Sequence, residues 1–215
     1  MTGRLLSVNA GQIRPAPYGN PGTGNTAIDK RPVAGRVAVH TLGVTGDHQD
    51  HPEHGGIDKA VYSYSRNDAL WWEAELGRSL QPGNFGENLT TDGVDITGAE
   101  IGERWRIGTV VLEVASPRTP CRVFAGFWDV PDLVKRFTAR GSPGGYLRVV
   151  TQGELAAGDA IEVLERPGHG VTLSDAFRAR TGDRDLVPRL LDAPQLPADW
   201  HAWARKVLGH PALSG

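Results

Sequence analysis

Short runs of β-branched and other apolar residues dominate the first three quarters of the chain, and glycines separate most of them. The runs fall at residues 4–8, 36–42, 60–63, 104–115, 146–151 and 159–164. This pattern predicts short strands joined by tight turns. In RWRIGTVVLEVAS (104–116) and GELAAGDAIEVLE (153–165), a glycine turn precedes a β-branched run, which is typical of consecutive strands in a barrel or sandwich.

Two segments interrupt this pattern with helical periodicity. Residues 65–77 (SRNDALWWEAELG) begin with capping-box spacing, carry apolar residues on one face and end in a glycine. Residues 130–141 (VPDLVKRFTARG) have a proline near the first turn and a glycine past the end. Because the first helix is amphipathic, we expect Trp71 and Trp72 to belong to the core rather than to stack on a substrate.

The pattern changes again after Pro167. Residues 171–180, 183–193 and 196–209 predict three helices, joined by a glycine and by a proline-containing stretch, with little strand signal. We therefore predict two domains, a β-rich domain at 1–166 and a helical domain at 167–215.

Composition and charge narrow the function classes. The 215 residues are 39% hydrophobic and carry a net charge of −2, whereas a general nucleic-acid binder carries a basic surplus. Neither a secretory leader nor an apolar run long enough to span a bilayer is evident, so the expected compartment is the cytoplasm. A single cysteine excludes an internal disulfide and an all-cysteine iron–sulfur cluster.

Three histidines crowd into residues 46–60, GDHQDHPEHGGIDKA. The three-residue spacing of His48, His51 and His54 would align them on a helix and suggests zinc, but Pro52 and the following glycine pair disfavour a helix. A solvated polar loop is the favoured interpretation. His54 stays of interest, because the adjacent glycines allow a backbone to approach a ligand closely.

Two further glycine-rich segments are short loops by their composition. GNFGENLTT (83–91) is predicted to be a turn entering a strand, with Asn88 bonding its own backbone. GSPGGY (141–146) has neither the lysine nor the spacing of a phosphate-binding P-loop, so a nucleotide-triphosphate site is not expected.

The only cysteine ends the segment SPRTPC (116–121). Two prolines make this segment a stiff loop just beyond a strong predicted strand. Cys121 is interpretable as inert packing, as a nucleophile or as a metal ligand, and the charge of Arg118 three residues earlier would favour a thiolate. A nucleophile would also need a base, for which His54 and His40 are candidates.

Taken in order, these segments resemble the MOSC family, named for the C-terminal domain of molybdenum cofactor sulfurases, and in particular its YiiM-type bacterial members. The matching segments lie at 27–33, 42–64, 83–93, 101–121 and 144–163. The tail resembles the three-helix domain that follows the barrel in that subgroup. The five segments in this order are specific for the family, although each segment alone is weak evidence for it.

The resemblance implies a mixed α/β fold, mainly an antiparallel β-barrel with helical insertions, followed by a small three-helix C-terminal domain. It implies a molybdenum–pterin cofactor (molybdopterin) whose metal is bound by the motif cysteine, which is Cys121 here. It also implies reduction of N-hydroxylated compounds such as amidoximes, hydroxamates and hydroxylaminopurines. The pyridoxal-phosphate domain of the sulfurases has no counterpart, so sulfurase activity is not expected.

The cofactor carries a phosphate, so basic residues within the matching segments are candidates for binding it. We favour Lys30, Lys59 and Arg118, with Asn88 and Thr119 as hydrogen-bonding partners. Surface salt bridges are the alternative for the two lysines.

Proton delivery and electron supply are the remaining requirements. His54 or Glu87 is the expected proton relay, and the sequence does not decide between them. Because this chain has no iron–sulfur cluster of its own, electrons must come from an external flavodoxin- or ferredoxin-like reductase system. A homodimer is left open.

Two other functions are compatible with the same residues. One is a non-catalytic carrier of the molybdenum cofactor. The other is a thiol hydrolase that uses Cys121 with a histidine.

Overall fold

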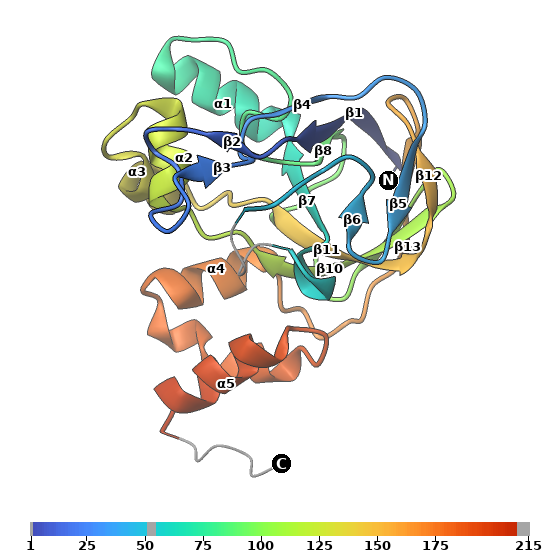
Figure 1. Cartoon of the computed structure of the whole chain (residues 1–215). Helices are drawn as coiled ribbons and strands as arrows, with labels where there is room; N and C mark the ends of the chain where they lie inside the picture. The colour runs from blue at the N-terminus through green and yellow to red at the C-terminus, as the bar shows by residue number, and fades with distance from the viewer. Residues whose placement is uncertain (1, 51–54, 210–215) are drawn as a thin grey trace.

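A closed barrel of seven strands forms the centre of the computed structural model, which describes residues 2–50 and 55–209 (Figure 1). In order around the barrel, the strands are β1 (Thr2–Gly11), β8 (Leu89–Asp92), β7 (Val61–Ser65), β11 (Gly145–Thr151), β10 (Val110–Pro117), β9 (Arg104–Ile107) and β13 (Ala160–Glu165). Thr2 pairs with Glu162 and closes the barrel. The predicted mixed fold with a mainly antiparallel barrel is confirmed.

One pair of neighbouring strands in the described barrel is parallel. Strands β7 and β8 run side by side in the same direction, with Ser63 opposite Leu89. Parallel neighbours need a crossover connection, which here contains helix α1 (Arg66–Leu76). The helix begins where the Ser65 side chain accepts a hydrogen bond from the backbone of Asn67, and it ends at Gly77 in the left-handed conformation. The predicted start and stop are confirmed, although the Ser65 bond goes to Asn67 and not to Asp68, as a capping box would require.

Short strands extend the barrel at one side. β4 (Lys30–Pro32) pairs with the end of β1, and β5 (Val37–His40), β6 (Gly43–Val44) and β12 (Gly153–Leu155) form a small sheet. β2 (Arg14–Pro15) and β3 (Asn25–Thr26) pair with each other. We call the segment from Arg14 to Thr26 the 14–26 hairpin.

Two helices that follow Cys121 pack with α1 around an aromatic cluster. They are α2 (Arg122–Trp128), which the sequence analysis missed, and α3 (Leu133–Arg140), which starts later than predicted. The cluster consists of Tyr62, Tyr64, Trp72, Phe85, Phe124, Trp128 and Phe137, together with smaller residues. The expectation for the tryptophan pair is confirmed for Trp72, which is fully buried, whereas Trp71 is 41% exposed beneath the guanidinium of Arg140.

Helical segments make up the tail as predicted, and two of them are α-helices in the described residues 167–209. These are α4 (Leu173–Thr181) and α5 (Ala198–Val207). Between them lie two short 3₁₀ segments, η2 (Arg184–Leu186) and η3 (Pro188–Asp192), and a further one, η1 (Ile57–Lys59), precedes β7. The predicted middle helix is therefore present as 3₁₀ segments, and Pro188, which has no backbone N–H, cannot continue a regular α-helix through them.

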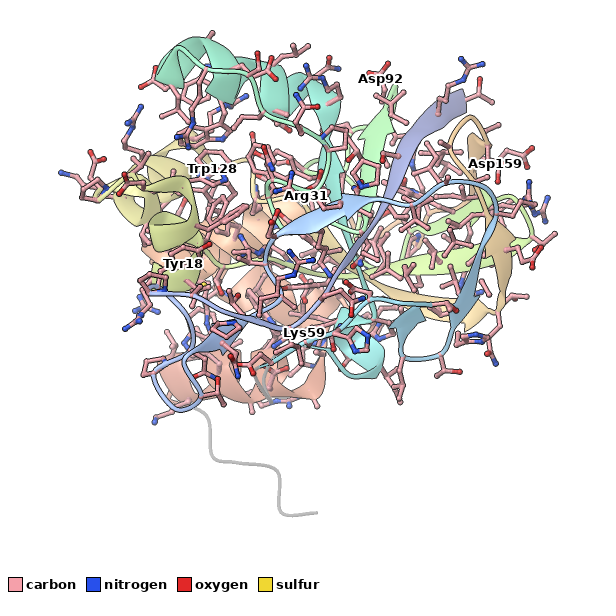
Figure 2. The ribbon with its side chains drawn as sticks, turned by 45° about the horizontal axis from the view of Figure 1, so that its top comes forward. Tyr18, Arg31, Lys59, Asp92, Trp128 and Asp159 are labelled. Atoms are coloured by element: carbon pink, nitrogen blue, oxygen red, sulfur yellow. The ribbon has the colours of Figure 1, made fainter. Side chains whose placement is uncertain are left out.

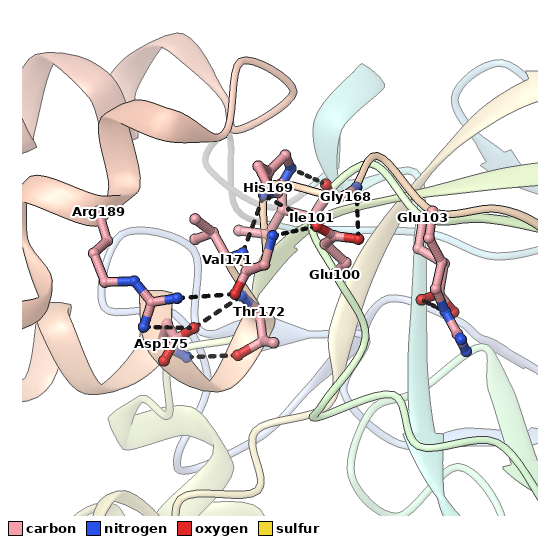
Figure 3. A network of polar contacts seen from close by, with 11 residues as sticks. Glu100, Ile101, Glu103, Gly168, His169, Val171, Thr172, Asp175 and Arg189 are labelled. Carbon is pink, nitrogen blue, oxygen red and sulfur yellow. Dashed lines mark hydrogen bonds and ion pairs between the residues drawn. The ribbon is translucent and has the colours of Figure 1, made fainter.

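The tail and the barrel share one buried apolar cluster, which includes Leu147 of the barrel and Leu173 and Trp200 of the tail. Figure 3 shows the polar junction beside it, where the carboxylate of Glu100 accepts hydrogen bonds from the backbone N–H groups of Gly168 and Gly170. The division into domains at 1–166 and 167–215 stays a prediction. The described helices are all too short or too polar to span a lipid bilayer.

Candidate functional site

A cavity of about 350 Å³ lies between the 14–26 hairpin, the loop after β6 and the start of helix α2. Its wall includes residues from segments far apart in the sequence: Asn25, Ile28, Lys30, His48, Asp50, Lys59, Tyr62, Gly86, Asn88, Arg118, Cys121, Arg122, Val123 and Tyr146. Polar and basic groups therefore meet an apolar wall in one concave space, as in small-molecule sites of other proteins.

Cys121 lies in the wall of this cavity and is partly exposed. Its backbone is extended at the residue that precedes helix α2, and the side chain also packs against the aromatic cluster. The two prolines of SPRTPC keep the chain extended up to this point, where the helix can begin. The thiol is thus available to a ligand in the cavity, which a fully buried packing residue would not be.

Arg118 is a buried cation beside the thiol. It is 6% exposed and lines the cavity, and its guanidinium carbon lies 5.3 Å from the ring centre of Tyr62 and 4.6 Å from that of Phe124. Cation–π contacts of this kind fix the orientation of a guanidinium. One of its terminal nitrogens, Nη1, has no hydrogen-bond partner within the part of the chain that the structure describes.

Two tyrosines stand next to this cation. Tyr62 and Tyr146 line the cavity with ring centres 5.3 Å apart, and the Tyr62 hydroxyl donates to the carbonyl of Pro143 at 2.8 Å. Burial raises the pKa of both phenols, although the charge of Arg118 acts in the opposite direction. Both tyrosines are therefore neutral at physiological pH.

Lys30 and Asn88 lie together in the cavity wall, as the sequence analysis proposed for cofactor-binding residues. Lys30 is buried and forms an ion pair with Asp47. Burial lowers the pKa of Lys30, while the charge of Asp47 opposes this shift. The expected salt bridge is present, but it is buried and not at the surface.

Residues 83–91 form a turn that enters strand β8, as predicted, but the predicted bond from the Asn88 side chain to its own backbone is absent. Its side-chain oxygen accepts a hydrogen bond from the backbone N–H of Tyr62 at 3.1 Å, and its amide nitrogen donates to the Asn9 carbonyl at 3.2 Å and to Asp47 at 2.8 Å. The parallel pairing of β7 and β8 brings these strands beside Asn88 and replaces the local bond with long-range ones.

Glu87 faces its own loop and is not among the residues that line the cavity. Its carboxylate accepts hydrogen bonds from the backbone of Gly83 at 2.7 Å, the backbone of Phe85 at 3.0 Å and the hydroxyl of Thr90 at 2.7 Å. Burial raises the pKa of Glu87, and these donors oppose the rise. The glycine at 83 is required, since a Cβ there would lie 2.2 Å from the Lys30 carbonyl oxygen.

The other predicted residues fall in different places. Lys59 lines the cavity (labelled in Figure 2), whereas Thr119 is exposed and is not a lining residue. His54 and His51 lie outside the described residues. His48 lines the cavity, but no group of three potential metal-binding His, Cys, Asp or Glu side chains occurs in residues 2–50 and 55–209.

Several features of the cavity were not predicted from the sequence. The 14–26 hairpin forms part of its wall, and Arg122 ties it to helix α2 by donating to the Gly19 carbonyl at 3.0 Å. Tyr18 of this hairpin lies beside α2, with its ring centre 6.1 Å from that of Phe127 (Figure 2). No separate role was predicted for Asp47, which lies within the histidine-rich segment.

Comparisons with known proteins agree on one family. The model of the MOSC domain matches residues 50–162. Uncharacterized protein YflK of Bacillus subtilis (strain 168) is 33% identical over 202 residues, which are 92% of this chain and 91% of that protein. Protein YiiM of Escherichia coli (strain K12) is 31% identical over 202 residues, which are 91% of this chain and 88% of that protein.

A third relative is much longer than this chain. A protein of Gibberella moniliformis (strain M3125 / FGSC 7600), named "Reductase", is 35% identical over 202 residues, which are 91% of this chain and 35% of that protein. Among solved structures, YiiM from Geobacillus stearothermophilus matches with a TM-score of 0.81 at 28% identity, covering 96% of this chain and 99% of that chain. YiiM from Escherichia coli matches with a TM-score of 0.76 at 26% identity, covering 97% and 94%.

Proposed function

The chain belongs to the MOSC domain family, and from this premise we propose that it is a molybdenum-cofactor oxidoreductase that reduces N-hydroxylated small molecules. The observation that carries the proposal is the cavity in which the single thiol, Cys121, lies with the buried cation Arg118. The name of the relative called "Reductase" supports the oxidoreductase part of this proposal.

The residues present fit a molybdenum–pterin group. A soft thiolate suits a sulfur-rich metal site, so Cys121 is the proposed metal ligand. The buried Nη1 of Arg118 has no partner among the described residues, and an anionic ligand such as a phosphate would satisfy it. A cavity of about 350 Å³ is within the usual size range of small-molecule sites.

Each wall residue then has a defined task. Arg118 and Lys59 supply positive charge for the phosphate, Lys30 offers an N–H donor from the neighbouring wall, and the amide oxygen of Asn88 can accept one further hydrogen bond. Thr119 is exposed, and we no longer include it among the cofactor-binding residues. The apolar side chains of Ile28 and Val123 exclude water from part of the cavity.

The chemistry requires two electrons and two protons for each N–OH group that becomes N–H and water. When bound, the cofactor supplies a metal that exchanges the two electrons. Glu87 contacts three donors of its own loop and does not line the cavity, which disfavours it as the direct proton donor and leaves His54 as the proposed relay. The electrons come from an external flavodoxin- or ferredoxin-like system, and we place the protein in the cytoplasm.

Elemental analysis tests this proposal directly. Wild-type protein, Cys121→Ala and the control Thr119→Ala are purified from a host that makes the cofactor, and molybdenum and pterin are measured per chain. We expect both in wild type and Thr119→Ala, and loss of molybdenum in Cys121→Ala. Absence of molybdenum from wild type, or equal amounts with and without the thiol, would refute the proposal.

Turnover separates the enzyme from a carrier. With a reduced flavodoxin system, the loaded wild-type protein should convert an amidoxime to the amidine, and Cys121→Ala should not. A loaded protein that reduces no amidoxime, hydroxamate or hydroxylaminopurine would instead be a cofactor carrier.

A further inference from the structure

Asp47 lies directly behind the cavity wall and does not line it. Its side chain is only 2% exposed. The carboxylate accepts hydrogen bonds from the backbone N–H of Gly11 at 2.8 Å, from the amide of Asn88 at 2.8 Å and from the ammonium of Lys30. These donors come from β1, from the residue before β8 and from β4, so one carboxylate joins three separate parts of the chain.

Two of the three donors belong to side chains that do line the cavity. Lys30 reaches Asp47 through its ammonium, and Asn88 reaches it through one N–H of its amide. The other polar groups of Asn88 are held by the backbones of Tyr62 and Asn9, so Asp47 completes the set that fixes its orientation. A buried carboxylate with three donors is well suited to orient the groups that touch a ligand.

We propose that Asp47 is the positioning residue of the cavity: it holds Lys30 and Asn88 in the orientation that binds the pterin cofactor. This inference rests on the proposed function. It also changes the role of Lys30, whose charge is balanced by Asp47, so the positive potential in the cavity comes mainly from Arg118 and Arg122. Lys30 contributes a directed N–H instead.

The substitution Asp47→Asn separates this role from simple packing. The amide has the same shape but only one acceptor oxygen, and its NH₂ group would face the donors of Lys30 or Asn88. The matched control is Glu103→Gln, because Glu103 is also a buried carboxylate, 5% exposed at its side chain, that accepts from Trp105 at 2.7 Å and Arg166 at 2.9 Å. Glu103 does not line the cavity.

The measurement is the pterin dissociation constant of the full chain, from equilibrium dialysis with fluorescence detection after oxidation of the pterin. We expect Asp47→Asn to weaken binding about tenfold or more, as substitutions behind a ligand-binding group do. Glu103→Gln should stay within about twofold of wild type, even if both variants lose thermal stability. Equal binding by Asp47→Asn and Glu103→Gln would overturn the inference.

A second variant keeps the test decisive if Asp47→Asn fails to fold. Asp47→Glu retains the charge that balances Lys30 but displaces the carboxylate by one methylene. A positioning role predicts weaker binding in this variant too, whereas wild-type binding, or a failure of both variants to fold by circular dichroism, would overturn it. Absence of pterin from wild type would instead count against the proposed function itself.

Discussion

Gly126 of helix α2 packs tightly against Tyr18 of the 14–26 hairpin, which forms part of the cavity wall. Gly126 lies inside helix α2, and a Cβ added there would be 2.2 Å from the Cβ of Tyr18. The optimal separation of two non-bonded carbon atoms is about 3.5 to 4.0 Å, and 2.2 Å is strongly repulsive, so one of the two segments must move. We therefore expect Gly126→Ala to push the hairpin away from α2.

Two opposing effects determine how much Gly126→Ala changes the free energy of unfolding. Alanine within a helix is favoured over glycine by about 1 kcal/mol. Overpacking a core costs about 1 to 3 kcal/mol. The contact between Gly126 and Tyr18 is only partly buried, but the colliding atom is a Cβ, which cannot rotate away. The clash wins, and we expect the free energy of unfolding to fall by about 1 kcal/mol, or roughly 2 to 4 °C in Tm for a chain of this size.

Thermal and urea unfolding of Gly126→Ala measure the loss, and the rate at which a bulky maleimide alkylates Cys121 reports whether the cavity has opened. The decisive background is Tyr18→Gly, because alanine at 18 would keep the colliding Cβ. There, Gly126→Ala should become stabilising through its helix propensity. If Gly126→Ala stabilises the protein with Tyr18 present, or if the sign does not reverse, the steric reasoning is wrong.

Three further predictions concern buried groups of the barrel and the tail. Glu100→Gln should lower the free energy of unfolding by about 2 kcal/mol, because it removes the charge that binds two backbone N–H groups. Burial raises the pKa of Glu100, but the N–H groups of Gly170 and Gly168 outweigh this effect, and the net pKa is lowered. The stability that Glu100 gives the wild type above the ordinary glutamate range should therefore be lost as pH falls, and urea unfolding should show a smaller loss in the variant. The pH dependence of stability at Glu87 has the opposite sign, since burial raises the pKa of this carboxyl. Its contribution to stability is present at acid pH and is lost as pH rises through the raised pKa. The Tm of Glu87→Gln should therefore change less with pH over this range than the Tm of the wild type, and identical pH profiles would contradict this. Leu173→Ala, at a fully buried site shared by tail and barrel, should cost about 2 to 5 kcal/mol in urea unfolding, whereas a loss under about 0.5 kcal/mol would mean that the tail is not docked as described.

Local signals account for most of what the sequence predicted. The strand runs, the capping of α1 and the stop at Gly77 depend on periodicity and on single residues, so they are visible without the fold. Helix α2 gave no such signal, because its seven residues include an internal glycine and too few polar positions to define a face. Phe124 and Trp128 stabilise it through the aromatic cluster, which forms only when distant segments meet.

The candidate site also combines features that the sequence predicts with features that depend on long-range contacts. The family resemblance selected Lys30, Lys59, Asn88, Arg118 and Cys121, which the structure brings to one cavity. It could not place Thr119 outside that cavity or assign the carboxylate of Asp47, since both depend on the direction of a side chain. The bonds of Asp47 span 36, 17 and 41 residues, and no pattern within a short window reports contacts of that range.

The closure of the barrel has a consequence for biosynthesis. β1 is made first, yet the register that seals it joins Thr2 to Glu162 and Arg4 to Ala160. At roughly 5 to 20 residues per second, a ribosome needs on the order of ten seconds or more to supply β13 after β1 has emerged. Throughout that interval the edge of β1 at Thr2–Arg4 has unpaired backbone groups, and such edges can pair with other chains. The aggregation of the nascent chain and its need for chaperones should therefore depend on how fast the chain is translated as far as β13.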